Sequence, residues 1–286
     1  MLHSLDHVMV VVRDLEEATR QTEALFGRKA SWRGIHTDAG SANALFRLSN
    51  TYLELISPVG AGFAGRALEA ALEQQGEGEL GLAFGTDDAE ACAARLRAAG
   101  LPVRDPWEGE GHSSDSDDVR HWRNVMIGAE ATRGPWLFGI EHLDAEDLLP
   151  VVEPDDPTAS IQALDHVVLV SRDLEATKKL YGEQLGLRLA LDHNFEARDL
   201  RMLFFRVGGA TIEVIGRIGA EPDRDARDRF GGLAWQVPDA DVARQRIAEA
   251  GFDVSEVRGG NKPGTRVCTV RGEPCGVKTL LIEPGA

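Results

Sequence analysis

The chain repeats its own opening segment. Residues 5–16 read Leu-Asp-His-Val-Met-Val-Val-Val-Arg-Asp-Leu-Glu and return in closely similar form at 164–175, an offset of 159 positions. At that offset 14 of the 53 positions from 5 to 57 are identical without a gap, and Glu54 coincides with Glu213. In each copy a histidine opens one apolar run and a glutamate lies inside a later run, and the two are separated by the same number of residues. We expect each copy to form the same structural unit.

Each copy predicts a strand, a helix and three further strands. The apolar, β-branched run 8–12 is typical of a strand that is buried on both faces. Asp14 and Asp173 stand where a helix N-cap is expected, and Gly27 and Gly186 follow the helical stripes as C-terminal glycines. Shorter strand-like runs follow, ending near 56 and 215, so the unit is βαβββ.

A weaker repeat follows each of these units. Residues 81–84 match 232–235 at an offset of 151, as do Arg95 and Arg246. Four βαβββ units in two pairs predict an α+β fold with a first domain at 1–143, an acidic, proline-containing linker at 144–160 and a second domain at 161–286. The polar segment 107–118 reads as a long loop, either a lid over a site or simply solvated.

Composition narrows the possible partners. The 286 residues carry a net charge of −16, which repels nucleic acid and anionic membranes. No apolar run approaches the roughly 20 residues of a membrane span, and no signal-peptide pattern opens the chain. The 3 cysteines are too few and too scattered for a disulfide framework. We therefore predict a cytoplasmic protein, a monomer or homodimer, that acts on a small molecule and has no nucleic-acid or membrane partner.

The repeated histidine and glutamate suit a metal site. An imidazole nitrogen and a carboxylate oxygen are ligands that Zn, Fe, Mn, Ni and Co accept, and His7 with Glu54 recurs as His166 with Glu213. A carboxylate within an apolar strand is costly unless it is paired or bound to a metal. The alternative is that the glutamates pair with Arg47 and Arg206 and that both histidines are hydrogen-bonded core residues.

These residues carry a resemblance to a known superfamily. The repeated Leu-Asp-His opening, the segment 180–187 (Leu-Tyr-Gly-Glu-Gln-Leu-Gly-Leu) and the later strand with its glutamate resemble the vicinal oxygen chelate superfamily, which comprises glyoxalase I, bleomycin-resistance proteins and extradiol dioxygenases. The resemblance implies that two βαβββ units curl into an open barrel around a cleft. It also implies that metal ligands come from the first and last strands of each unit, at positions His7, Gly81, His166 and Gly232, with Glu54 and Glu213 in the odd units.

The register of the last strand in the even units is open. If Ile140-Glu141 and Ile282-Glu283 align with the odd units, each cleft contains one histidine and two glutamates, which is the alignment we favour slightly. Aligning Pro284 with Pro58 instead puts Leu280 at the ligand position and leaves Glu283 on the opposite face.

Two further segments bear on the reaction. Gly232 stands where the resemblance to extradiol dioxygenases implies a second histidine, although His193 could reach the site, and Tyr52 and Tyr181 are the only tyrosines. The segment 33–47 resembles the glyoxalase-like branch, so His36 and Asn43 are expected either to line the first cleft or to belong to a surface loop. The remaining histidines His112, His121 and His142 are expected in surface loops, with His142 as a possible supplement to Glu141.

The resemblance implies two functions of different class. The favoured one is a divalent-metal enzyme that chelates two neighbouring oxygens of a small substrate as an isomerase, epimerase or lyase rather than a dioxygenase, with Glu54 or Glu213 also acting as base. Substrate contacts are expected from His36, Asn43, Arg47, His193 and Arg206. The alternative is a metal-free drug- or metabolite-binding protein, in which Gly81 and Gly232 leave space for a flat ligand. One pair of units could also have become structural support for the other.

Overall fold

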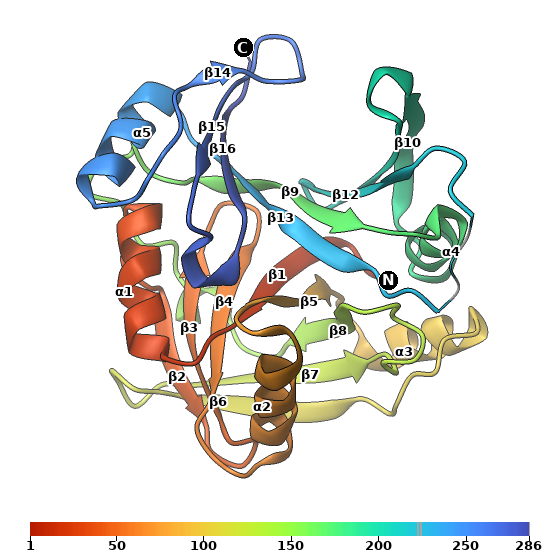
Figure 1. Cartoon of the computed structure of the whole chain (residues 1–286). Helices are drawn as coiled ribbons and strands as arrows, with labels where there is room; N and C mark the ends of the chain where they lie inside the picture. The colour runs from red at the N-terminus through yellow and green to blue at the C-terminus, as the bar shows by residue number, and fades with distance from the viewer. Residues whose placement is uncertain (222, 224, 286) are drawn as a thin grey trace.

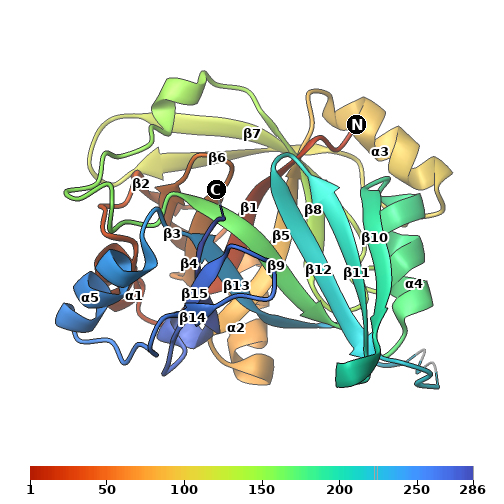
Figure 2. The same ribbon diagram turned by 90° about the horizontal axis from the view of Figure 1, so that it is seen from above.

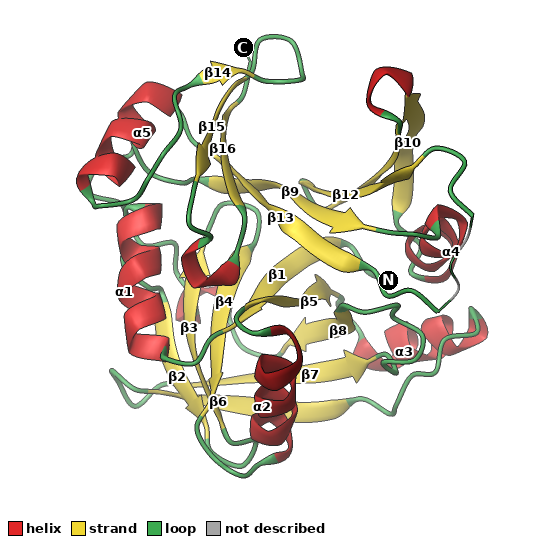
Figure 3. Ribbon diagram, in the orientation of Figure 1, coloured by secondary structure: helices red, strands yellow, loops and turns green. Residues whose placement is uncertain are grey.

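The computed structural model describes residues 1–221, 223 and 225–285, which form two halves built from strands with helices on their outer sides (Figures 1 and 3). The first half contains β1 (Ser4–Val11), α1 (Leu15–Phe26), β2 (Trp32–His36), β3 (Ser41–Arg47), β4 (Tyr52–Pro58), α2 (Phe63–Gln75), β5 (Gly78–Gly85), α3 (Ala89–Ala98), β6 (Trp107–Ser113), β7 (Val119–Met126) and β8 (Trp136–His142). A short 3-10 turn, η1 (Glu146–Leu148), lies between the halves.

The second half contains β9 (Ala163–Val170), α4 (Leu174–Lys178), the π-helix η2 (Lys179–Gln184), β10 (Arg188–Phe195), the 3-10 turn η3 (Glu196–Arg198), β11 (Leu200–Val207), β12 (Ala210–Arg217), β13 (Arg229–Gln236), α5 (Ala240–Glu249), β14 (Arg258–Gly259), β15 (Arg266–Val270), the 3-10 turn η4 (Pro274–Gly276) and β16 (Thr279–Glu283). The predicted α+β fold of paired βαβββ units is confirmed. In the described part of the chain, no helix is both long and apolar enough to cross a membrane.

The two halves close their sheets differently. Strands of the first half form a closed barrel in the order β1-β4-β3-β2-β6-β7-β8-β5, whereas the second half is a sheet in the order β10-β11-β12-β9-β13-β16-β15-β14. The first barrel closes where β2 pairs with β6, with Gly34 opposite Ser113 and Ile35 opposite His112. The loop predicted at 107–118 was therefore wrong over its first part, because 107–113 is the strand that closes the barrel.

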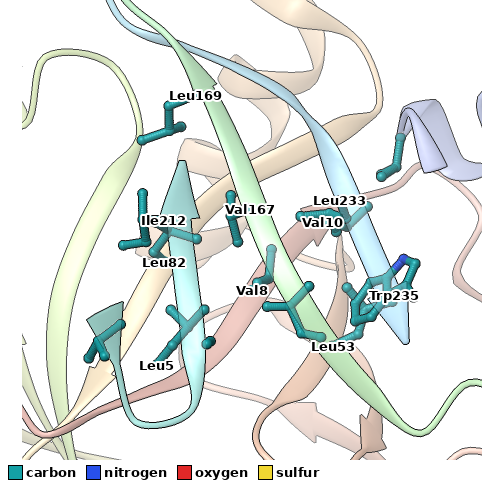
Figure 4. Close-up of a cluster of buried hydrophobic side chains, with 14 of the residues drawn as sticks. Leu5, Val8, Val10, Leu53, Leu82, Val167, Leu169, Ile212, Leu233 and Trp235 are labelled. Atoms are coloured by element: carbon teal, nitrogen blue, oxygen red, sulfur yellow. The ribbon is translucent and has the colours of Figure 1, made fainter. Parts of the chain in front are cut away.

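Side-chain alternation on β1 explains why its second half, from Val8 to Val11, is apolar on both faces. Val8 and Val10 point out of the barrel into the large core between the halves, where they meet Val167 and Leu233 of the second sheet (Figure 4). Met9 and Val11 belong to a separate cluster inside the first half. Since successive side chains point to opposite faces, one face of β1 joins the halves and the other faces the barrel interior.

Two arginines that match in the sequence repeat also join the halves. Arg246 of α5 donates from Nη2 to the Leu25 carbonyl, at 2.7 Å, at the C-terminal end of α1. Arg95 of α3 reaches the Leu185 carbonyl in the same way. α5 consequently lies beside α1, and α3 beside α4 (Figures 1 and 2). Each cation satisfies carbonyls that a helix C-terminus leaves without partners.

The repeated glycines fit this contact. Gly27 and Gly186 have φ of 72° and 78°, the left-handed conformation that favours glycine at a helix end. A Cβ at Gly27 would lie 3.0 Å from Arg246 Cζ, and one at Gly186 would lie 2.8 Å from Arg95 Nη2. The glycines are thus required both for chain reversal and for the approach of the arginine from the other half.

Trp235 tests the core between the halves. It is 1% exposed and packs edge-on against Phe26 of the first half, with ring centroids 4.9 Å apart. Trp235→Ala should lower the free energy of unfolding by about 3–5 kcal/mol, because it leaves a cavity in a packed core. Urea titration followed by circular dichroism measures this. Val242→Ala, on the exposed face of α5, is the control and should shift the value by about 0.5 kcal/mol or less. An equal effect of the two substitutions would contradict the proposed role of the core.

Candidate functional site

The first barrel encloses a cavity of about 710 Å³. It lies between the inner faces of the strands, and side chains of α2 reach it from one side. A Cβ at Gly65 in the first turn of this helix would lie 2.0 Å from the Gly60 carbonyl oxygen. Glycine is therefore needed for the helix to pack this closely against the preceding loop. The lining is strongly aromatic and includes four of the chain's five tryptophans: Trp32, Trp107, Trp122, Trp136, with Phe63, Phe138 and Tyr52.

His7 and Glu54 face one another at this cavity. They lie on the neighbouring parallel strands β1 and β4, where His7 is opposite Tyr52 and Met9 is opposite Glu54. His7 Nε2 lies 3.4 Å from Glu54 Oε2, and both residues line the cavity. Within the described residues, His7 Nε2 is buried and makes no hydrogen bond. The imidazole stacks on the Tyr52 ring at a centroid distance of 4.6 Å, which fixes its plane.

The other nitrogen of His7 is held by a carboxylate. Asp6 Oδ1 lies 2.7 Å from His7 Nδ1, and Asp6 Oδ2 lies 2.9 Å from His142 Nε2. Asp6 therefore links β1 to the end of β8 and orients the His7 ring. A carboxylate on the far nitrogen is the arrangement that metal-binding histidines usually have.

Glu54 is held from its other side by Asn43. Asn43 Nδ2 donates to Glu54 Oε1 at 2.7 Å and lies 3.4 Å from His36 Nε2, while His36 Nδ1 lies 2.9 Å from Ser41 Oγ. Because Asn43 Nδ2 is a donor, His36 Nε2 accepts this hydrogen bond. The proton of the neutral His36 ring is therefore on Nδ1. His36 and Asn43, two of the residues expected from the sequence, both line the cavity.

The charge states follow from these contacts. Burial opposes a charge on His7, but the carboxylates of Asp6 and Glu54 outweigh it and raise the pKa of His7 to about 9. Burial would raise the pKa of Glu54, yet His7 and Asn43 together lower it. Asp6 is buried too, and His142 and His7 hold its pKa far below the usual range. Burial lowers the pKa of His36, which keeps this ring neutral.

The second half repeats the arrangement more loosely. His166 Nδ1 lies 2.7 Å from Asp165 Oδ1, and His166 Nε2 lies 4.0 Å from Glu213 Oε2. Gln236 Nε2 donates to Asp165 at 2.9 Å. Burial raises the pKa of Glu213, the opposite of the shift at Glu54. The second pair thus has the same carboxylate contacts as the first, but its imidazole and glutamate lie further apart, at 4.0 Å against 3.4 Å.

Glu141 and Glu283 do not face the two clefts. Glu141 accepts from the backbone N–H of Ala89 at 3.0 Å and Glu283 from that of Ala240 at 2.9 Å, so each carboxylate lies at the N-terminus of a helix outside the sheet. The favoured alignment of the even units is therefore corrected. The third ligand position is taken by Phe138, opposite Ala83 on β5, and in the second half by Leu280, opposite Ala234, as the alternative alignment has it.

Gly81 and Gly232 do not leave space for a ligand. A Cβ at Gly81 would lie 2.6 Å from the Trp136 carbonyl oxygen, and one at Gly232 would lie 2.5 Å from that of Lys278. Each glycine lies beside a register shift in its pairing with β1 or β9. Their role is the close approach of a neighbouring strand at a bulge.

The remaining residues from the sequence analysis are dispersed. Arg47 is not among the residues that line the cavity, and Arg206 and His193 are exposed on the second sheet. No ion pair joins either arginine to Glu54 or Glu213 among the described residues. His112 and His121, expected in surface loops, lie on β6 and β7 instead; His112 pairs with Glu110 on the surface, whereas His121 pairs with Asp144 and also lines the cavity. His142, expected in a surface loop, instead ends β8, contacts Asp6 and lines the cavity.

The donor set fits a divalent metal in part. His7 Nε2 is unpartnered, adjoins an ionised carboxylate, and has a carboxylate on its far nitrogen, as a metal ligand requires. Over the described ranges, however, no group of three or more His, Cys, Asp or Glu side chains is arranged to hold a metal ion. If a metal were bound here, these two residues would be its protein ligands, and further ligands would have to come from a bound molecule and water.

A barrel of two βαβββ units with a histidine and a glutamate on its inner face defines a glyoxalase-type protein. Residues 5–162 match the family described as "Glyoxalase-like domain", and residues 165–269 match the "Glyoxalase/Bleomycin resistance protein/Dioxygenase superfamily". The chain therefore belongs to the glyoxalase-like domain family, within the superfamily that the sequence resemblance indicated. A comparison with curated proteins found no match.

Two solved structures share the fold of the whole chain, and a third matches only part of it. A mutant of 4-hydroxymandelate synthase from Streptomyces coelicolor is 16% identical and has a TM-score of 0.69 over 100% of this chain and 94% of that one. A hypothetical protein from Staphylococcus aureus is 13% identical with a TM-score of 0.67, covering 96% and 97%. Methylmalonyl-CoA epimerase from Mycobacterium tuberculosis is 21% identical, with a TM-score of 0.37 over 44% of this chain and 90% of that one.

Several site residues were missed from the sequence. Asp6 and Asp165 precede the histidines in both copies, so the repeat itself carried the signal for a carboxylate beside each imidazole. The tryptophans and Phe138 had no such signal, because nothing in a single sequence shows that scattered aromatic residues surround one cavity. Arg120 on β7 was also missed, because it lies beyond the predicted loop 107–118 and no motif marks it.

The cap contacts of Glu141 give a first prediction for this site. Glu141→Ala should lower the free energy of unfolding by about 0.5–2 kcal/mol, because the N-terminus of α3 loses a carboxylate partner. Metal content and ligand affinity should stay at wild-type values. Glu69→Ala, on the exposed face of α2 and outside the cavity lining, is the matched control. Loss of bound metal from Glu141→Ala would contradict the placement of this side chain outside the cavity.

The pKa of His7 gives a second prediction, for metal-free protein in EDTA. Because the folded pKa of about 9 lies above the unfolded value near 6.5, protonation of His7 stabilises the fold fully below pH 6.5. This contribution should fall as pH rises from 6.5 and be lost above about 9. Urea titrations across this range should show the decline in wild type and in the surface control His112→Gln. His7→Gln should lack it, and a decline of equal size in His7→Gln would contradict the assignment.

Proposed function

We propose that the first barrel is the reactive site of a divalent-metal enzyme acting on a small oxygenated organic molecule, as an isomerase, epimerase or lyase of the glyoxalase type. The observation that carries the proposal is His7 Nε2, a buried nitrogen without a hydrogen bond that adjoins Glu54 and faces the cavity. A buried polar atom that makes no hydrogen bond costs free energy unless a ligand satisfies it.

Each polar residue would have a distinct part. His7 and Glu54 would hold the metal, which when bound supplies Lewis-acid polarisation of a substrate oxygen. Asp6 accepts from His7 Nδ1 and fixes the orientation of the ring, so that Nε2 is directed at Glu54 and the cavity. Asn43 holds Glu54 Oε1 and leaves Oε2 directed at His7. Glu54 is ionised and is the buried carboxylate that can accept a proton from a carbon next to a carbonyl.

The residues favour proton transfer over dioxygenation. The sequence resemblance implies two histidines and one glutamate for an extradiol dioxygenase, and here Gly81 and Phe138 stand at the two remaining positions of the first barrel. The Phe138 ring packs edge-on against His7 with centroids 5.6 Å apart, so it also restricts the space beside the imidazole. In the second half, His193 is exposed on β10 and does not reach His166.

A metal-free binding protein is the second candidate. It is favoured by the aromatic lining of the cavity and by the ion pairing of His7 with two carboxylates, which satisfies charge without a metal. Such a protein would bind a flat molecule and leave it unchanged. The His7–Glu54 pair would then only fix polar groups of the ligand.

We also propose that the second half supports the first. Its sheet is open and its His166–Glu213 pair is wider than the first pair. The domain boundaries 1–143, 144–160 and 161–286 are part of this proposal. They are supported by the strands, since β8 ends at His142 and β9 begins at Ala163.

Metal analysis tests the proposed function. Protein purified without chelator and reconstituted with Zn²⁺ or Mn²⁺ should bind one ion per chain at the first barrel, measured by elemental analysis and isothermal titration. His7→Ala should abolish this binding. Asp6→Asn should weaken it by about 10–100-fold, because the carboxylate that holds His7 Nδ1 is lost.

Two controls separate the alternatives. His166→Ala should keep the ion, because its cleft is not the proposed site. Less than one ion per chain in reconstituted wild-type protein would contradict the proposal of a metal-dependent enzyme. It would favour the metal-free binding protein. An ion lost with His166→Ala and retained with His7→Ala would instead move the site to the second half.

A further inference from the structure

Arg120 is a buried cation without a partner. It lies on β7, is 8% exposed, and lines the cavity of the first barrel. Its guanidinium carbon lies 5.5 Å from the centre of the Trp32 ring, so the group rests on an aromatic face. Throughout the described chain, no hydrogen bond or ion pair to its guanidinium is found. Five N–H donors are therefore gathered at the cavity with no acceptor assigned to them.

The other buried arginine shows what a structural role looks like. Arg28 is 5% exposed, and its guanidinium donates to the carbonyl oxygens of Val152 and Ile161 at 3.2 and 2.7 Å. Those bonds join the first half to the second. Arg120 makes no such contact, and the cation–π contact with Trp32 alone is worth about 0.5–2 kcal/mol, less than burial of a charge costs.

Neighbouring carboxylates already have partners. Glu54 is held by His7 and Asn43, and at the edge of the cavity Glu108 pairs with Arg123 and Glu110 with His112. Of the described arginines that line the cavity, Arg104 is exposed and Arg120 is buried, so Arg120 is the buried cation without a protein partner there, in a chain whose net charge is −16. A guanidinium in this state is complementary to a planar carboxylate, which it can bind through two parallel hydrogen bonds.

We infer that Arg120 selects the ligand of the first barrel, a flat and largely apolar molecule that carries one carboxylate. The carboxylate binds Arg120, and the ring system lies among the tryptophans. The inference rests on the proposed function only in taking this cavity as the ligand site, and it requires no metal. A singly charged carboxylate fits one guanidinium, whereas a phosphate dianion would bring excess negative charge next to Glu54.

The test uses three probes with the same ring. Naphthalene-2-carboxylate, naphthalene-2-carboxamide and 2-naphthyl phosphate are titrated into the whole chain, with binding followed by quenching of tryptophan fluorescence and by calorimetry. The wild type should bind the carboxylate about tenfold or more tighter than the amide, and tighter than the phosphate. Titrations with and without EDTA separate a carboxylate held by Arg120 from one held by a metal.

Variants on one strand provide the comparison. Arg120→Gln should remove the preference for the carboxylate and leave the amide affinity unchanged within about twofold. Arg123→Gln is the matched control, because Arg123 lies on the same strand but outside the cavity, and it should keep the preference. The thermal midpoint of ligand-free Arg120→Gln should equal or exceed that of wild type, since a buried unpaired charge is removed.

Several results would overturn the inference. These are equal affinity for carboxylate and amide, no binding of either probe, tighter binding of the phosphate, or a preference that survives Arg120→Gln in EDTA. A fall of several degrees in the midpoint of Arg120→Gln would show that Arg120 supports the fold instead. None of these results depends on whether metal analysis finds an ion, so the inference and the proposed function can fail separately.

Discussion

The molecule depends on the packing of two sheets against one another through the outward faces of β1 and β9. Val8 and Val10 of the first half and Val167 and Leu169 of the second are all buried in this one core. Because strand side chains alternate, burying one face commits the other face of β1 to the barrel interior. His7 is thereby directed inward, and the same reasoning applied to Leu53 and Leu55 of β4 directs Glu54 inward as well. The polar centre of the cavity is a consequence of how the halves pack.

The internal repeat is explained by the same arrangement. Arg95 and Arg246 each bind the end of a helix in the other half, and Gly27 and Gly186 leave room for them. These positions match across the repeat because both halves make the same contact in opposite directions. Glu141 and Glu283 have a related role, since each accepts from the first N–H group of the helix that precedes it in its own unit. Repetition in this chain therefore marks the joints of the fold as often as it marks chemistry.

Much of the fold could be predicted from the sequence, but less of the site. The repeat and its periodicity predicted paired βαβββ units, and the resemblance implied that His7 and Glu54 come from the first and last strands of one unit. The register of β8 and β16 could not be fixed, because Ile140-Glu141 and Leu280 both fit a strand pattern and only the pairing with β5 and β13 distinguishes them. Segment 107–118 read as a loop because its polar residues obscure the strand that closes the barrel.

The two halves differ where the repeat breaks down. In the first half β6 closes the barrel, α2 lies against it, and aromatic residues from several strands surround an enclosed space that holds His7, Asn43 and Arg120. Each of these side chains has polar atoms without a protein partner, and burial makes that costly. In the second half the sheet stays open and solvent can satisfy the corresponding groups around His166. A fold that needed only stability would fill such a cavity with apolar side chains, so the unpartnered polar atoms of His7 and Asn43 at the cavity support the proposal that ligand recognition is located there.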